Sequence, residues 1–186
     1  VKAAFRDAGY RVHAQVFDCS RYRVPQRRKR LLLVGVREEL SFAFPAPIDR
    51  PVSVREALGL RGAYAAGGVE RAQSSRNGKE RGWWQGGRAL DVSLPGYTVG
   101  TRDNYDLLVP EDDVARAEVE AMRVRSGRKP SPGGYRLNVE ELKVLQGAPA
   151  YRLVGKMSEQ HYAIGNMVPP PLAEVVGRAL AQTLTP

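Results

Sequence analysis

The sequence predicts an α/β fold, and three segments carry that prediction. The run 31–36 is continuously apolar, which is typical of a strand buried on both faces of a sheet. Residues 10–17 alternate between apolar and polar side chains, as a half-buried strand does. Three prolines at 169–171 can form the first turn of an amphipathic helix, which should pack on the sheet that these strands begin.

The remaining elements follow from capping signals and local composition. In the strand 10–17, the side chains expected to face the core are Val12, Ala14 and Val16, with His13 on the polar face. Further helices are expected over 1–8 with Gly9 as its cap, from Ser53 to Gly59, from Pro110 to Gly127, and from Asn138 to Gly147. Short strands are expected at 94–99 and 105–109, a basic linker at 128–134 and a loop at 155–160.

The net charge and the cysteine content indicate what kind of partner and which cellular compartment to expect. The 186 residues carry a formal charge of +9, which favours a polyanionic partner, most often nucleic acid. Cys19 is the single cysteine, so no internal disulfide can form, and a reducing compartment is expected. No activating base or helix terminus is apparent beside it, which argues against a nucleophilic role. The sequence shows no apolar run long enough for a membrane span and no signal peptide.

The most informative cluster follows Pro25, where a turn, a basic run and the apolar strand meet. Gln26, Arg28 and Arg30 occupy alternate positions, so their side chains can lie on one side of an extended backbone. Guanidinium groups fixed in this way bind phosphate or a carbonyl edge through paired hydrogen bonds. The alternative is a solvated basic turn that precedes a strand.

Two other segments have both a functional and a structural interpretation. Residues 61–87 are rich in Gly, Ser, Asn, Arg and Lys around two tryptophans, which suits a nucleic-acid recognition surface or a surface loop anchored by one Trp. Gly165 and Asn166 are expected in a tight turn before the last helix. There Asn166 either caps the turn or helps to hold a small polar ligand.

Three segments together resemble the C-terminal part of the cytosine-5 DNA methyltransferase family. Residues 25–30, Pro-Gln-Arg-Arg-Lys-Arg, resemble the Gln-x-Arg-x-Arg motif, the eighth of the family. Residues 136–149 resemble the ninth motif, although Asn138 and Ala148 stand where Thr and Phe are usual. Residues 164–168 resemble the tenth. The order agrees with the family, and a variable segment lies where the family keeps its target-recognition region.

The resemblance implies a partial Rossmann-like methyltransferase sheet with a small, loop-rich, β-containing target-recognition region. It divides the chain into catalytic strands at 1–47, the recognition region and linker at 48–134, and returning helices at 135–186. Arg30 would hold the edge of a cytosine flipped out of the duplex, while Gln26 and Arg28 would orient the catalytic loop and the DNA backbone. Gly165, Asn166 and Val168 would complete the S-adenosylmethionine pocket.

By the same resemblance, the segment 61–103 would read sequence in the major groove of duplex DNA. The candidate DNA contacts are Arg76, Lys79, Arg81, Trp83, Trp84, Arg88 and Arg102. The Pro-Cys-Gln nucleophile and the glycine-rich cofactor loop of the family are absent from the sequence. We therefore expect the chain alone to be inactive, and to need the N-terminal methyltransferase half or to self-associate. The expected setting is restriction-modification in the bacterial cytoplasm, near the nucleoid.

Three other functions are also compatible with the sequence. The chain could be a catalytically inactive relative that binds DNA or regulates an active methyltransferase. It could instead be an RNA-directed relative of the same family, or a basic globular domain without any link to methyl transfer.

Overall fold

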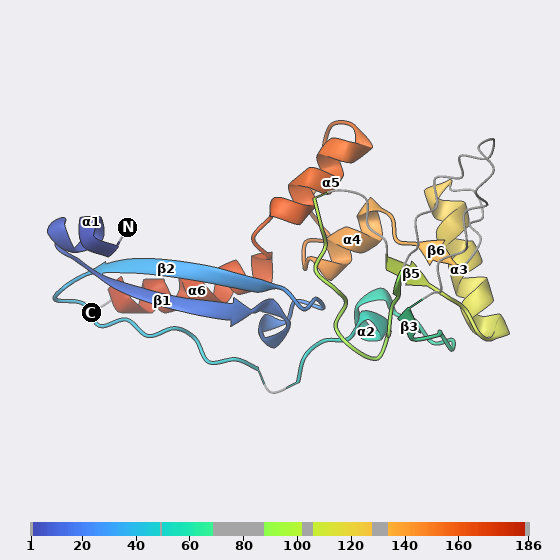
Figure 1. Cartoon of the computed structure of the whole chain (residues 1–186), viewed down its shortest axis with the longest axis horizontal. Coiled ribbons are helices and arrows are strands. Elements are labelled where there is room, and N and C mark those ends of the chain that lie inside the picture. Colours follow the sequence, from blue (N-terminus) through green and yellow to red (C-terminus); the bar gives the residue numbers. More distant parts are fainter. Residues whose placement is uncertain (1, 49, 69–87, 102–105, 128–133, 185–186) are drawn as a thin grey trace.

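The computed structural model describes residues 2–48, 50–68, 88–101, 106–127 and 134–184 (Figure 1). The helices are α1 (Lys2–Asp7), α2 (Val54–Leu58), α3 (Asp113–Ser126), α4 (Val139–Leu145), α5 (Met157–Asn166) and α6 (Pro170–Leu184), with a short 3-10 helix η1 (Cys19–Tyr22). The strands are β1 (Tyr10–Asp18), β2 (Lys29–Arg37), β3 (Gly67–Gly68), β4 (Arg88–Ala89), β5 (Asp106–Leu108) and β6 (Tyr135–Arg136). Among the described residues, no helix has the length and apolar character needed to cross a bilayer.

The first lobe, here called the hairpin lobe, consists of α1, β1, η1, β2 and α6. Strands β1 and β2 are antiparallel, with Tyr10 opposite Arg37 and Asp18 opposite Lys29. Helix α6 returns to this hairpin from the far end of the chain and runs along it (Figure 1). Leu172 of α6 shares a core with Phe17 of β1, as the apolar stripe of the helix predicts. The mixed α/β fold class is thus confirmed.

The prediction of the buried face of the hairpin is wrong. Val16 and its cross-strand partner Leu31 are 60% and 61% exposed, and Leu33 is 44% exposed. The buried face carries Phe17 and, from β2, Val34 and Val36. Alternation reveals that a strand has two faces, but other elements decide which face is covered. Here the aromatic connector after β2 and helix α6 cover the face of Phe17, so among the described residues β2 is buried on one face only.

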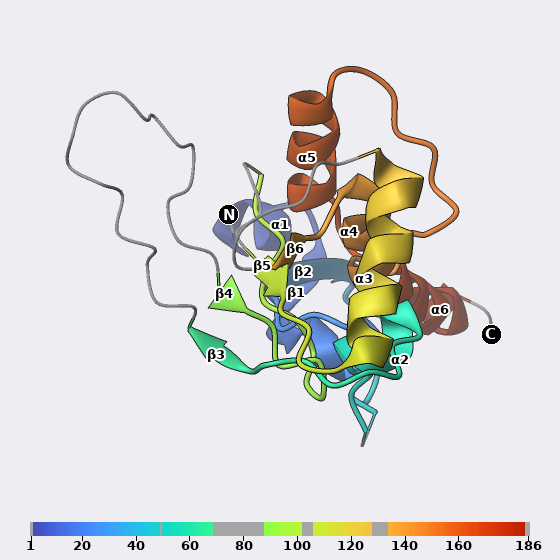
Figure 2. The ribbon, with the colours of Figure 1, turned by 90° about the vertical axis from the view of Figure 1, so that its right-hand side faces the viewer.

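The second lobe, here called the helical lobe, comprises α2 to α5 and a small sheet in the order β3-β4-β5-β6. Figure 2 shows these helices gathered around the sheet, with α3 on the outside. One apolar core includes Val54 and Leu108 together with Leu142 of α4 and Ile164 of α5. The helices α4 and α5 therefore share their core with residues from 54 to 122, and within the segment 135–184 only α6 contributes to the core of the hairpin lobe.

Local capping chemistry sets the ends of most helices as expected. Ser53 and Glu56 form a reciprocal capping box at α2, and Asn138 and Glu141 form another at α4. Asp112 accepts a hydrogen bond from the backbone N–H of Ala115 at the start of α3. Helices α2 and α4 begin where the sequence pattern predicts, whereas α3 begins at Asp113, three residues after the predicted start at Pro110.

Two local predictions are wrong. Residues 94–99 form no strand and make only a single parallel bridge, between Gly96 and Gln26. The segment 155–160 is not a loop, because α5 begins at Met157, and Gly165 and Asn166 consequently lie in the last turn of a helix rather than in a tight turn. Glu159 accepts a hydrogen bond from the backbone N–H of Lys156, 2.8 Å away, and so caps this helix through a side chain in its own polar first turn.

Candidate functional site

Gln26 lies at the junction of the two lobes and is fully buried. Its side-chain nitrogen donates to the carbonyl of Leu145, at 3.2 Å, and to Oε1 of Gln146, at 2.8 Å. Its side-chain oxygen accepts from the backbone N–H of Val99, at 3.0 Å. Both atoms of the amide are therefore satisfied, and Gln26 ties the start of β2 to the end of α4 and to residue 99.

Arg28 extends the same junction with a side chain that is 1% exposed. One terminal nitrogen donates to the carbonyl of Val99, at 2.9 Å, and the other donates to the carbonyl of Gly165. The guanidinium group thus connects three segments that are far apart in sequence. Carbonyl oxygens are the acceptors here, since no carboxylate in the described part of the chain is ion-paired with Arg28.

Arg30 differs from the other two residues of the predicted cluster. Its side chain is partly exposed and donates to the carbonyl of its neighbour Lys29, at 2.8 Å. It lies within β2, opposite Phe17 of β1. Gln26 and Arg28 are therefore committed to internal hydrogen bonds, whereas Arg30 keeps donors available for a ligand.

Cys19 is unsuited to nucleophilic attack. The side chain is completely buried, and burial raises the pKa of the Cys19 thiol from 9.0 to about 11, although the nearby charge of Arg30 acts in the opposite direction. A thiolate is the reactive form of cysteine, so this thiol is inert at neutral pH. The structure agrees with the sequence-based interpretation.

Gly165, Asn166 and Val168 lie at and just beyond the end of α5. Gly165 is buried against the backbone of residues 100–101, where an added Cβ would stand 2.6 Å from Thr101 Cα. Only glycine allows this close approach. Asn166 and Val168 are exposed, and the Asn166 side chain makes no hydrogen bond to the described residues. Its amide is available for a ligand.

Most of the predicted DNA-contacting residues lie outside the described part of the chain. These are Arg76, Lys79, Arg81, Trp83, Trp84 and Arg102. Arg88 belongs to β4, which pairs with β3 and with β5 in the small sheet. Within the described residues, no group of three or more His, Cys, Asp or Glu side chains is placed to hold a metal ion.

Sequence reasoning missed two members of the junction. Gln146 is fully buried and, besides accepting from Gln26, donates to the carbonyl of Met167, at 2.8 Å. Its place between Leu145 and Gly147 in the ninth-motif segment was the only available signal. Val99 contributes through its backbone N–H and carbonyl, which no side-chain pattern can reveal.

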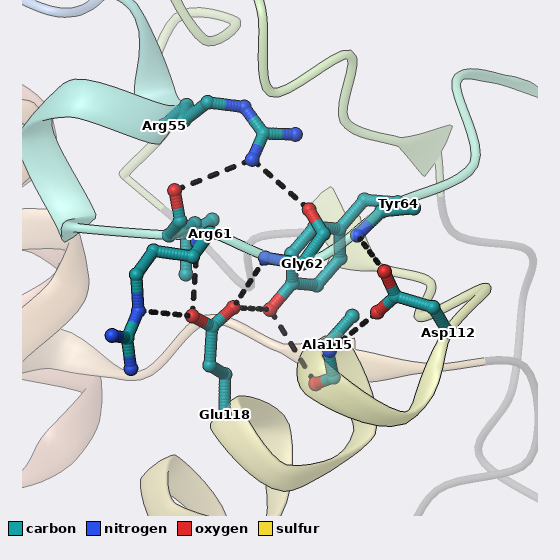
Figure 3. A network of polar contacts seen from close by, with 9 residues as sticks. Arg55, Arg61, Gly62, Tyr64, Asp112, Ala115 and Glu118 are labelled. Atoms are coloured by element: carbon teal, nitrogen blue, oxygen red, sulfur yellow. Dashed lines mark hydrogen bonds and ion pairs between the residues drawn. The ribbon is translucent and has the colours of Figure 1, made fainter.

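A second polar network holds the turn after α2 against α3 (Figure 3). The Glu118 carboxylate accepts from the backbone N–H groups of Arg61 and Gly62 and from the Tyr64 hydroxyl, at 2.9, 3.2 and 2.9 Å. Burial opposes ionisation of Glu118, but these hydrogen bonds outweigh it and hold its pKa below the ordinary 4.5. Burial, followed by the bond to Glu118, raises the pKa of Tyr64. These groups serve the fold of the helical lobe.

Comparison with known proteins identifies the family. Residues 1–182 match the family described as C-5 cytosine-specific DNA methylase. The chain belongs to this family. It is 27% identical over 208 residues to the Type II methyltransferase M.BspRI of Lysinibacillus sphaericus, covering 96% of this chain and 45% of that protein. It is 29% identical over 191 residues to the Type II methyltransferase M.NaeI of Lentzea aerocolonigenes, covering 96% and 43%. The chain thus spans less than half of these methylase relatives.

Solved structures agree at the level of the fold. The Entamoeba histolytica methyltransferase EhMeth aligns with a TM-score of 0.62 at 8% identity, over 99% of this chain and 57% of that one. The Dnmt2 methyltransferase of S. pombe aligns with a TM-score of 0.60 at 11% identity, over 99% and 60%. The methylase fold is therefore shared at low sequence identity, and the fit extends over almost the whole chain.

Proposed function

We propose that this chain is the C-terminal part of an enzyme that methylates C5 of cytosine in duplex DNA. In this proposal the chain binds the DNA, holds a cytosine that is flipped out of the helix, and forms one side of the S-adenosylmethionine pocket. The target-recognition region and its linker span 48–134, and the DNA contacts are Arg76, Lys79, Arg81, Trp83, Trp84, Arg88 and Arg102. The Type II methyltransferases among the relatives favour a role in restriction-modification.

The observation that carries the proposal is the hydrogen bonding of Arg28. Its guanidinium holds the carbonyls of Val99 and Gly165 at once. In this way the segment that resembles the eighth motif, the end of the predicted recognition segment and the segment that resembles the tenth motif meet at one point. Such a junction supports Arg28 and Gln26 as positioning residues, because the Gln26 amide and both terminal nitrogens of Arg28 form hydrogen bonds inside the protein.

Arg30 is the residue we assign to the substrate. It lies in β2, two residues beyond the buried Arg28, and its side chain is partly exposed. A flipped cytosine presents its O2 atom as a hydrogen-bond acceptor, which a fixed guanidinium donor satisfies. Holding this edge keeps the base in place while a thiolate from another segment attacks C6.

The exposed Asn166 and Val168 suit one wall of a cofactor pocket. The Asn166 amide offers a donor and an acceptor, and the carbonyl end of α5 carries partial negative charge that complements the cationic groups of S-adenosylmethionine. When bound, that cofactor supplies an electrophilic methyl group. The described residues would provide only part of its donor set, so the rest of the pocket must come from another segment.

The state of Cys19 favours a second candidate, a catalytically inactive DNA-binding or regulatory member of the family. The sole thiol of the chain is buried and its pKa is raised, so the chain itself has no nucleophile. Both candidates share DNA binding and differ in whether an active N-terminal half operates with this chain.

One experiment separates the two. The chain is combined with an N-terminal methyltransferase half that carries Pro-Cys-Gln, and transfer of tritium-labelled methyl groups to duplex DNA is measured. We expect transfer that depends on both parts and that falls at least tenfold on Arg30→Ala. Failure of every such combination to methylate, with DNA binding intact, would favour the inactive relative. Unchanged transfer by Arg30→Ala would refute the role of Arg30.

A further inference from the structure

Arg27 stands between two buried residues but is itself exposed. In an extended segment successive side chains point to opposite sides, so Gln26 and Arg28 point into the junction and Arg27 points away from it. Arg27 therefore presents its charge on the outer side of the same backbone that organises the junction.

The backbone of this segment is fixed by its pairing with residues 96–98. The N–H of Arg27 donates to the carbonyl of Gly96, at 2.8 Å, and the N–H of Gly96 donates to the carbonyl of Pro25, at 3.0 Å. The Thr98 hydroxyl donates to the carbonyl of Arg27, at 2.7 Å. Since the flanking Gln26 is also buried, the Cα of Arg27 is held on a rigid support.

The side chain is oriented as well. The guanidinium carbon of Arg27 lies 4.9 Å from the centroid of the Tyr97 ring, which is the geometry of a cation–π contact. No carboxylate among the residues that the structure describes neutralises it, whereas Arg178 pairs with Glu174 and Arg116 pairs with Asp113. Arg27 is thus an oriented cation whose charge is not cancelled.

We propose that Arg27, oriented by Tyr97, contacts a backbone phosphate of duplex DNA. A guanidinium fork matches two phosphate oxygens, and a side chain already held in place loses less entropy on binding. Residues 96–98 lie near the end of the predicted recognition segment 61–103, so this contact would fix the duplex where that segment meets β2. The inference rests on the proposed function and adds a contact that carries no sequence information.

The test measures binding of the chain to a fluorescent duplex at several salt concentrations. Loss of one phosphate contact lowers the slope of log affinity against log salt by about 0.9. For Arg27→Ala we expect this change of slope and an affinity about tenfold lower at low salt, on all duplex sequences alike. Arg27→Gln serves as a second neutral variant, and circular dichroism checks that both variants fold.

Matched controls separate a local contact from a general loss of charge. Arg178→Ala removes the same unit of charge from α6 and should leave the slope unchanged. Tyr97→Leu keeps every charge but releases Arg27, so we expect the unaltered slope with an affinity two- to fivefold lower. Tyr97→Phe keeps the ring and should bind as the unaltered chain does.

The outcomes distinguish this inference from the proposed function. If both Arg27 variants keep the slope and affinity of the unaltered chain, while Arg81→Ala weakens binding, the phosphate contact is refuted and the proposed function stands. If the unaltered chain fails to bind duplex DNA even at low salt, both are refuted. Stronger binding to a structured RNA than to the duplex would overturn the assignment to DNA.

Discussion

The central elements of the two lobes differ in how they are covered: α4 and α5 are packed into a core, whereas the hairpin sheet is covered on one face. In the helical lobe, Leu142 and Leu145 of α4 and Ile164 of α5 are at most 1% exposed. In the hairpin lobe, α6 covers one face of the sheet, while Val16 and Leu31 on the other face are about 60% exposed. The helical lobe also exposes apolar side chains, with Val154 and Met157 at 75% and 61%, but α4 and α5 each bury one apolar face, whereas one face of the hairpin sheet is left uncovered by the described residues.

The connection between the lobes is polar. Gln26, Arg28 and Gln146 meet there with backbone groups, all with buried side chains. Directed hydrogen bonds fix orientation more specifically than apolar contacts do, which suits a place where segments far apart in the sequence must keep a fixed arrangement. Substitutions in this junction, in the helical lobe and in the hairpin should therefore have different effects.

Among substitutions at the junction, Arg28→Met should have the largest effect on the free energy of unfolding. It would leave the buried carbonyls of Val99 and Gly165 without their donor, at a cost of about 3 kcal/mol or more in the free energy of unfolding. Urea denaturation measures this quantity. Arg178→Met, which removes an exposed arginine from α6, should change it by less than about 0.5 kcal/mol. Equal midpoints for the two variants would show that Arg28 does not join the segments.

At the junction, Gly165→Ala should have the second-largest effect on the free energy of unfolding. The new methyl group would overlap the backbone of residues 100–101, and overpacking of this kind costs about 2 kcal/mol. Gly177→Ala on α6 is the matched control, since nothing lies within 4 Å of a Cβ there. That substitution should stabilise the chain by up to about 1 kcal/mol through helix propensity. Thermal unfolding of the pair should therefore shift in opposite directions, and a shared direction would contradict the close approach at Gly165.

Glu118→Gln should weaken the helical lobe by about 1–2 kcal/mol, because three donors lose a charged acceptor. The pKa of Glu118 is lowered in the folded state, so the stabilisation is complete above the ordinary value of 4.5. It is lost as the pH falls from there through the lowered pKa. Unfolding free energies measured from pH 7 to pH 3 should fall less steeply for the variant. Parallel curves would mean that the Glu118 charge does not support the turn.

Leu31→Lys should have the smallest effect on folding. The side chain is 61% exposed, so the free energy of unfolding should change by no more than about 0.5 kcal/mol. Self-association of the chain, measured by light scattering, should decrease because the apolar face is interrupted. Val34→Lys, on the covered face, is the contrasting variant and should unfold the hairpin lobe. Similar behaviour of the two would contradict the assignment of faces.

The sequence predicted elements with local signals well. Capping boxes at Ser53 and Asn138 and the apolar stripe from Leu172 located α2, α4 and α6, because such signals lie within a few residues of what they determine. The covered face of β1 could not be predicted, since it depends on α6 more than 150 residues away. The start of α5 was missed because the polar residues of its first turn resemble a loop.

In the candidate site, too, local features were predicted from the sequence, whereas features that depend on distant residues were not. The position of Gln26 and Arg28 at the start of a strand was predicted, but their burial was not, because their partners are mostly backbone carbonyls and N–H groups. A hydrogen bond to a backbone group does not require a particular side chain at that position, so the sequence pattern cannot predict it. The roles of Arg30 and Asn166 stay predictions.

The most direct test of the junction is a double-mutant cycle between Gln26→Leu and Gln146→Leu. Their side chains share a hydrogen bond of 2.8 Å and are separated by 120 residues in the sequence. We expect a coupling of about 1 kcal/mol or more in the free energy of unfolding, with the double variant less destabilised than the sum of the single ones. Additivity within about 0.3 kcal/mol would contradict a junction that joins the eighth- and ninth-motif segments.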